Sequence, residues 1–215
     1  MGKNNTLINA SPNGRSRISL RTIVLIGILG AVATAVMALK FPVPFAPPFY
    51  KLDMSDAIVM LGTFTLGPVA GIIIELIKVL LNFLIDGTVT MGIGELTNFL
   101  VGCLFVVPAS LIYRSRKTFS RAVIGLISGA VVSVVAAVVL NYFVLIPAYA
   151  SAFGMPIDTI VGMGSKINPA ISNLKTLVIF ATLPFNAVKM IICSLIAALL
   201  YKPLEKVINK AGTGR

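Results

Sequence analysis

The chain alternates between long apolar runs and short polar or proline-rich breaks, a pattern that predicts a bundle of membrane helices. An α-helix rises 1.5 Å per residue, so about 20 apolar residues cover the ~30 Å hydrocarbon core of a bilayer. The second run, of about 13 residues, is too short to cross alone if it stands perpendicular and faces lipid. The six expected segments are residues 18–39, 54–66, 68–85, 93–113, 122–148 and 173–201.

The breaks between these runs predict two long loops and two tails. Residues 41–53 read FPVPFAPPFYKLD, and four prolines within seven residues exclude a helix and favour a stiff, extended loop. Residues 149–172 carry several glycines and prolines and predict a second loop. Residues 1–17 predict a disordered polar tail and residues 206–215 a basic tail, leaving one membrane domain over residues 18–205. A signal peptide competes for the first run, which is however long and lacks a convincing cleavage site.

Composition and charge agree with a membrane protein and give its orientation. With 57% hydrophobic and 12% charged residues, the chain has too little polar surface for a water-exposed globule. The net charge of +11 would suggest nucleic acid in a soluble protein, but in a membrane protein it marks cytoplasmic loops. Six helices place both termini on one side, and 12 of the 18 Lys and Arg residues fall on that side. We therefore expect both termini in the cytosol, both long loops outside, and no nucleic-acid partner.

The sequence offers little of the chemistry that an enzyme or a metal site needs. It contains no histidine, which is the commonest metal ligand and general base. Its two cysteines, Cys103 and Cys193, lie in separate apolar runs, and no GxxxxGK[ST] phosphate-binding motif occurs. We expect no catalytic residue, no metal and no resident cofactor.

Polar residues on the last run predict a cavity inside the membrane, because such groups are costly in lipid and usually functional. Pro184 removes a backbone hydrogen bond beside them and predicts a local kink. The alternative is structural, with hydrogen bonds between helices and a lysine paired with Glu75 or Glu95. Spacings of four, three and four residues put this set on one helical face: Thr182, Asn186, Lys189 and Cys193.

Asn141 and Tyr142 on the fifth run add to this set. Asn141 lies about seven residues from the outer end of its helix and Asn186 about nine residues from the end of its own, so both amides sit about 10–14 Å deep. They either face one cavity open to the outside or clamp two helices together.

Three further charged residues have two readings each. Glu75 and Lys78 are spaced i, i+3 and are expected to neutralise each other. Glu95 follows a Gly-Ile-Gly turn, where its charge either caps a helix N-terminus or faces the cavity. In rival functions, Glu75 and Lys78 form the proton relay of an ion-coupled carrier, or Glu75, Glu95 and Lys189 serve an intramembrane enzyme. The missing histidine and the absence of a nucleophile–base motif count against the enzyme.

The first run carries small residues at four-residue spacing, which let another helix approach closely. That helix belongs either to the same chain or to another subunit. Gly27, Ala31 and Ala35 form one stripe, and Gly30, Thr34 and Ala38 form the stripe beside it.

Five pieces of the chain, taken in order with the six-helix plan, carry a family resemblance. They are the FPxP loop leading into KLDMSD (51–56), LGPVAGIIIELIK (66–78), GIGELTNFLVG (92–102), the NYF that begins at Asn141, and PFNAVK (184–189). Over about residues 18–205 the chain resembles the substrate-binding S components of energy-coupling factor (ECF) vitamin transporters, and it looks most like the riboflavin-specific members.

The resemblance implies a non-enzymatic subunit of the bacterial cell membrane. Such a subunit captures riboflavin from outside and delivers it inward after docking on a membrane T component and two cytosolic ATPases, which consume the ATP. Specificity for another vitamin is the nearest alternative. The resemblance also implies that Gly27, Ala31 and Ala35 pack on the T component.

The flavin site implied by the resemblance lies between the outer halves of the fourth to sixth segments, with residues 41–53 as a lid. Asn141, Asn186 and Lys189 match family positions that contact riboflavin. An apolar cavity with a few placed amides suits the flat tricycle and pyrimidine edge of a flavin, and the loop aromatics Phe45, Phe49 and Tyr50 could cover the ring. The expected ligand-binding residues are Asn141, Asn186, Lys189, Glu95, Tyr142, Tyr50, Lys51, Phe49 and Thr182.

Overall fold

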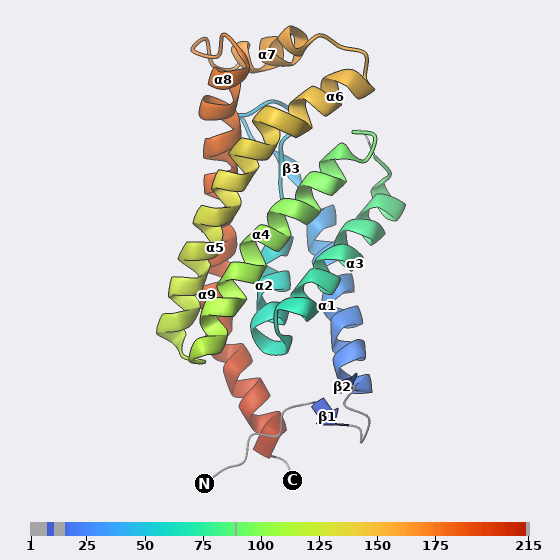
Figure 1. Ribbon diagram of the computed structural model, residues 1–215, viewed down its shortest axis with the longest axis vertical. Helices are drawn as coiled ribbons and strands as arrows, with labels where there is room; N and C mark the ends of the chain where they lie inside the picture. The colour runs from blue at the N-terminus through green and yellow to red at the C-terminus, as the bar shows by residue number, and fades with distance from the viewer. Residues whose placement is uncertain (1–7, 11–15, 89, 214–215) are drawn as a thin grey trace.

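The computed structural model describes residues 8–10, 16–88 and 90–213, which form a helical bundle (Figure 1). Two short antiparallel strand pairs accompany the helices: β1 (Ile8–Ala10) with β2 (Ser16–Ile18), and β3 (Phe41–Pro42) with β4 (Lys51–Leu52). The helices are α1 (Leu20–Ala38), α2 (Ser55–Leu66), α3 (Pro68–Asp86), α4 (Ile93–Ser115), α5 (Phe119–Leu140), η1 (Asn141–Leu145), α6 (Ile146–Ala152), α7 (Ile157–Ser165), α8 (Leu174–Leu177), η2 (Val178–Thr182) and α9 (Leu183–Thr213).

Five helical runs in the described part of the chain are long and apolar enough to cross a membrane, and they match five predicted segments. The remaining predicted segment, residues 54–66, forms α2, a helix of 12 residues. It packs against α1, α3, α4 and α9, and most of its residues are buried. Because protein rather than lipid surrounds α2, its short length leaves no backbone exposed to hydrocarbon. The five long runs are Leu20–Ala38, Pro68–Asp86, Ile93–Ser115, Phe119–Ala152 and Leu174–Pro203.

The break between α2 and α3 follows from two residues. Gly67 has φ = 102°, in the left-handed region that favours glycine. Pro68 then occupies the first turn of α3, where a missing N–H costs nothing. The chain therefore reverses within one residue and packs α2 directly against α3.

Two π-helical segments interrupt the last two of the five long runs, Phe119–Ala152 and Leu174–Pro203. The segment η1 begins at Asn141, and η2 ends at Thr182, two residues before Pro184. The two segments contact each other. A π turn widens the helix locally and often occurs at functional sites. The distortion predicted beside Pro184 is thus a π segment, and a second one faces it on the neighbouring helix.

Three regions differ from the sequence prediction. The predicted loop 149–172 contains the helix α7, which forms despite its glycines because Ile160, Val161 and Gly164 are buried against the bundle. The last helix continues from the apolar run through Pro203 to Thr213, so it includes most of the segment 206–215 that was predicted as a basic tail. Of the predicted disordered tail, residues 1–7 and 11–15 lie outside the described residues, whereas β1 and β2 pair. Residues 214–215 of the basic tail also lie outside them.

The two ends of the bundle carry different elements (Figure 1). The start of α1, the end of α9 and the α4–α5 turn lie at one end, whereas α6, α7 and the loop between β3 and β4 lie at the other. That loop, residues 41–53, is called the lid loop below. The antiparallel pairing of β3 with β4 joins the two ends of the lid loop.

Candidate functional site

A cavity opens in the end of the bundle that carries the lid loop. It lies among α4, the η1–α6 region, α7, α9 and the lid loop, and it encloses about 790 Å³ when counted out to open solvent. Its lining residues are Phe49, Tyr50, Lys51, Thr90, Ile93, Gly94, Thr97, Asn98, Val101, Asn141, Leu145, Ile146, Tyr149, Ile160, Phe185, Asn186 and Lys189.

Two buried amides, Asn141 and Asn186, face this cavity from the two π-distorted helices. Each uses its amide nitrogen to donate to the carbonyl four residues earlier in its own helix, that of Ala137 at 2.7 Å and that of Thr182 at 2.8 Å. These bonds fix the orientation of each amide. The Asn186 oxygen is left without a donor among the described residues and can accept a hydrogen bond from a ligand.

Tyr50 connects the lid loop to both π segments. Its hydroxyl donates to Asn141 Oδ1 at 3.1 Å and lies 2.6 Å from the hydroxyl oxygen of Thr182. Its ring packs against Phe49 and Phe185, with centroids 4.6 Å and 4.9 Å away. Burial raises the pKa of Tyr50 to about 12, although the Thr182 hydrogen bond opposes that rise. The phenol is therefore neutral and available as a donor at physiological pH.

Lys189 lines the cavity and is paired with carboxylates from the lid loop and from α2, which packs against α9. Its ammonium nitrogen is 3.0 Å from Asp53 Oδ2 and 3.0 Å from Asp56 Oδ2, and it donates to Asn98 Oδ1 at 3.3 Å. The alternative predicted from sequence, a pair with Glu75 or Glu95, is wrong. Asp53 ends the lid loop and Asp56 lies in the first turn of α2, so the fold brings both to Lys189 from far away in the sequence.

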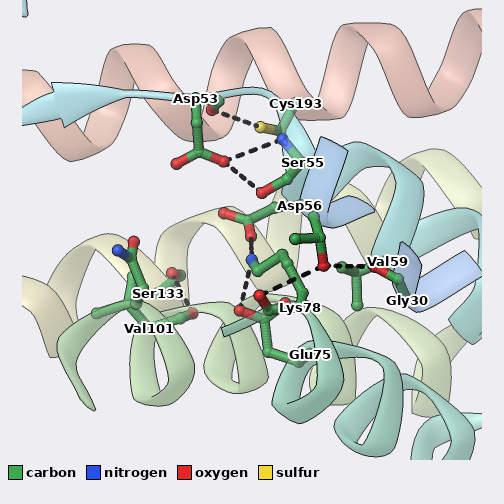
Figure 2. Close-up of polar contacts among 12 residues, drawn as sticks. Gly30, Asp53, Ser55, Asp56, Val59, Glu75, Lys78, Val101, Ser133 and Cys193 are labelled. Carbon is green, nitrogen blue, oxygen red and sulfur yellow. Dashed lines mark hydrogen bonds and ion pairs between the residues drawn. The ribbon is translucent and has the colours of Figure 1, made fainter. Parts of the chain in front are cut away.

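A second buried lysine, Lys78, extends this charged cluster toward α3 (Figure 2). Lys78 lies 2.5 Å from Asp56 Oδ1 and 2.6 Å from Glu75 Oε1, and all three side chains are almost fully buried. The predicted neutralisation of Glu75 by Lys78 is confirmed, with Asp56 as an additional partner. Gly102 of α4 makes room for the Glu75 carboxylate, which a Cβ at that position would meet.

A second, more polar cavity adjoins the first and shares five lining residues with it: Phe49, Lys51, Thr90, Gly94 and Asn98. Glu95 lines this second cavity and accepts hydrogen bonds from the hydroxyls of Thr88 and Thr90 at 3.1 Å and 3.0 Å. Glu95 therefore faces a cavity, one of the two readings left open by the sequence, but not the cavity that holds the two amides.

An ion pair closes one side of the second cavity. Lys40, at the end of α1, lies 2.9 Å from Asp86 Oδ2, at the end of α3, and donates to Asn82 Oδ1 at 3.0 Å. These contacts join the ends of α1 and α3 that lie nearest the lid loop.

The fold brings most of the predicted site residues together, with exceptions. Thr182 does not line the first cavity but is buried behind Tyr50. Tyr142 lies outside both cavities, is 36% exposed, and packs on Phe143. Of the three lid aromatics, Phe49 and Tyr50 line the first cavity, whereas Phe45 does not.

Sequence reasoning did not select Asp53 or Asp56, and it noted Asn98 beside Glu95 without counting it among the ligand-binding residues. Asn98 follows Glu95 by three residues on α4, which would have placed the two side chains on neighbouring faces. The two aspartates lie in the KLDMSD piece, which the resemblance already singled out. Two carboxylates beside an apolar run are costly unless they are paired, and this cost could have indicated that Asp53 and Asp56 have buried cationic partners.

The two small-residue stripes of α1 face different surroundings. Gly30 and Thr34 are buried against α3, where a Cβ at Gly30 would meet Ile77 and the Thr34 hydroxyl lies 3.5 Å from the Lys78 carbonyl oxygen. The other stripe is exposed along its length: Gly27, Ala31 and Ala35. The bundle itself therefore uses only one of the two stripes.

Comparison with known proteins identifies the chain's relatives. A sequence model of the family described as "ECF transporter, substrate-specific component" matches residues 21–201. The riboflavin transporter RibU of Staphylococcus aureus (strain TCH60) is 36% identical over 203 residues, which cover 92% of this chain and 99% of that protein. The riboflavin transporter FmnP of Bacillus subtilis (strain 168) is 28% identical over 191 residues, or 87% of this chain and 94% of that protein.

A solved structure supports the same relationship. The structure described as "Structure and mechanism of the S component of a bacterial ECF transporter" superposes with a TM-score of 0.68 at 35% sequence identity. The match covers 87% of this chain and 97% of that chain. The similarity therefore extends over most of the chain.

Proposed function

The chain belongs to the substrate-specific components of ECF transporters, and from this premise we propose that it captures riboflavin in the outer cavity and delivers it inward as part of an ATP-driven importer. It acts as a binding subunit rather than an enzyme. Its partners are a membrane T component and two ATPases, which supply the energy.

The observation that carries this proposal is the combination of aromatic walls with fixed amides in one cavity. The isoalloxazine ring is flat and apolar, and Phe49, Tyr149 and Phe185 offer aromatic surface for it. The pyrimidine edge of a flavin presents two carbonyl acceptors on either side of one N–H donor. Asn186 offers an oxygen to that N–H, and Asn98, which also lines the cavity, can offer its amide nitrogen to a carbonyl.

Lys189 contributes a positive charge close to the carbonyl edge. Its three N–H groups already have three acceptors, of which Asn98 is the only neutral one and the most distant. A flavin oxygen can replace Asn98 at the ammonium while both carboxylates keep it neutralised.

The polar second cavity is the natural place for the ribityl chain. It opens beside the first cavity through residues that both share, and its walls carry hydroxyl, amide and carboxylate groups such as Thr90, Asn82 and Glu95. Hydroxyl groups of a sugar chain both donate and accept, so they suit such mixed walls.

Orientation and docking follow from the two ends of the bundle and from α1. We place both termini in the cytosol and six helices in the membrane, because Arg21, Arg114, Arg116, Arg121 and Lys202 gather toward the end opposite the lid loop. The exposed stripe Gly27, Ala31 and Ala35 would pack on the T component, since small residues let two helices approach closely.

The proposal is tested by titrating riboflavin with protein purified in mild detergent from cells grown without it. We expect saturable quenching of flavin fluorescence with one flavin per chain. The Asn186→Ala variant should weaken this binding at least tenfold, whereas Tyr142→Phe, outside both cavities, should leave it unchanged. A wild-type protein that is well folded but gives no quenching would exclude riboflavin as the ligand.

A further inference from the structure

Asp53, at the end of the lid loop, makes polar contacts with both α2 and α9. Its carboxylate receives a hydrogen bond from Lys189 on one oxygen, and on the other it receives the backbone N–H of Ser55 at 3.0 Å and the Ser55 hydroxyl. Its carbonyl oxygen lies 3.9 Å from the Cys193 sulfur (Figure 2). Asp53 is only 4% exposed, so these contacts are shielded from water.

Asp53 also follows directly on β4, and this places it close to the parts of the lid loop that cover the cavity. It lies three positions after Tyr50, a span of about 10 Å even for an extended chain. Any movement of Tyr50 or Phe49 away from the cavity must therefore pull on the residue that is ion-paired with Lys189. The lid aromatics and the lysine that are connected through Asp53 all line the first cavity: Phe49, Tyr50 and Lys189.

The neighbouring Asp56 has a different role, because it is shared between two lysines. One of its oxygens lies 2.5 Å from Lys78 and the other 3.0 Å from Lys189. Removing its charge would leave two buried ammonium groups with too few counter-ions and would damage the bundle as a whole. Asp53, by contrast, has a single cationic partner among the described residues, and Lys78 keeps both of its carboxylates when Asp53 changes.

We propose that Asp53 is a positioning residue: its ion pair with Lys189 both aims that lysine at the ligand and holds the lid loop closed over the cavity. The proposal rests on the proposed function only for the identity of the ligand. The position of the lid loop and the position of the Lys189 ammonium are then coupled through this ion pair. A ligand that engages Lys189 strengthens closure, and opening of the lid withdraws one of the two counter-charges of Lys189.

The decisive experiment is a double-mutant cycle on riboflavin affinity with Asp53→Asn, Lys189→Gln and the double variant. An asparagine can still accept from Ser55 through its oxygen, but its amide nitrogen offers donors to an ammonium that needs acceptors. Asp53→Asn should raise the Kd about tenfold or more, as expected for one hydrogen bond to a charged group. In the Lys189→Gln background, the same change should raise the Kd less than threefold, because Asp53 then has no lysine to position.

Limited trypsin digestion without riboflavin provides a second readout that a general loss of stability does not give. Lys51 lies on β4 in the lid loop and is exposed, so cleavage after it reports opening of the lid. Asp53→Asn should speed this cleavage severalfold relative to cleavage in the α4–α5 turn. Asp158→Asn removes an exposed carboxylate from the first turn of α7 and serves as the matched control, with both readouts unchanged.

The outcomes separate this proposal from the proposed function. Unchanged affinity and unchanged cleavage in Asp53→Asn would overturn it, as would equal effects of the substitution with and without Lys189. A wild-type protein that does not bind riboflavin would defeat the proposed function instead. The cleavage rates of wild type and Asp53→Asn would then decide alone whether the ion pair holds the lid.

Discussion

Replacing Tyr50 by phenylalanine isolates the polar link between the lid loop and the two π-distorted helices. The substitution keeps the ring, and with it the packing on Phe49 and Phe185, but removes the hydroxyl. Two hydrogen bonds are lost, to Asn141 at 3.1 Å and with Thr182 at 2.6 Å. Both are partly buried, so each contributes about 0.5–1.5 kcal/mol to the closed lid.

The expected loss is about 1–2 kcal/mol in total, since the freed Asn141 oxygen recovers part of it by accepting from water or from the ligand. If ligand binding requires the closed lid, this loss weakens riboflavin affinity about 5- to 30-fold. Fluorescence titration of both proteins in the same detergent measures the ratio, with Tyr142→Phe as the matched control. Equal Kd values for wild type and Tyr50→Phe would refute the reasoning, and so would an equal loss in Tyr142→Phe.

The same tyrosine predicts a pH dependence of stability. Because burial raises the pKa of Tyr50 to about 12, the native state keeps its phenolic proton over a range where an unfolded tyrosine, with a pKa near 10, loses it. The unfolded state then binds fewer protons, and stability falls as the pH rises from about 10 to 12. Thermal unfolding without ligand should show this fall in wild type and less of it in Tyr50→Phe. Parallel curves for the two proteins would contradict the assignment.

Two further predictions concern the buried charges and the exposed stripe. Lys78→Met leaves two buried carboxylates short of a counter-charge and should destabilise the bundle by about 3–5 kcal/mol, seen as a lower unfolding midpoint; an unchanged midpoint would mean that the cluster is not ionised. Ala31→Leu should reduce riboflavin uptake by cells that carry the partner subunits while binding in detergent is retained, whereas Val131→Leu, on the exposed face of α5, should leave uptake unchanged. Normal uptake with Ala31→Leu would remove this stripe as the docking surface.

Much of the fold could be read from local sequence because each element depends on local signals. Apolar runs of sufficient length predicted five of the spans to within a few residues, and Gly67 followed by Pro68 marked the α2–α3 turn. The helix α7 was missed because its glycines and its neighbour Pro156 are typical of a loop. Burial of Ile160 and Val161 against the bundle offsets that weak propensity, and burial of this kind is a tertiary effect.

The site was only partly predictable, because helical spacing relates residues of one helix and says little about contacts between helices. The depth argument brought Asn141 and Asn186 together correctly at the first cavity. The same reasoning could not tell which of two tyrosines faces that cavity. Tyr50 does, and Tyr142, beside Asn141 in sequence, points elsewhere because neighbouring residues on a helix lie about 100° apart.

The sequence by itself determined a membrane bundle and the presence of polar groups that lipid would not tolerate, and its charge distribution predicts an orientation. Those properties depend on composition and local order, which any conformation of the chain retains. Only the tertiary structure decided that Lys189 pairs with Asp53 and Asp56, 136 residues away in the first of these pairs. An ion pair in a dry interior forms wherever packing brings the two charges together. The contact between the lid loop and Lys189 depends on this packing, and the spacing of residues along the sequence does not predict it.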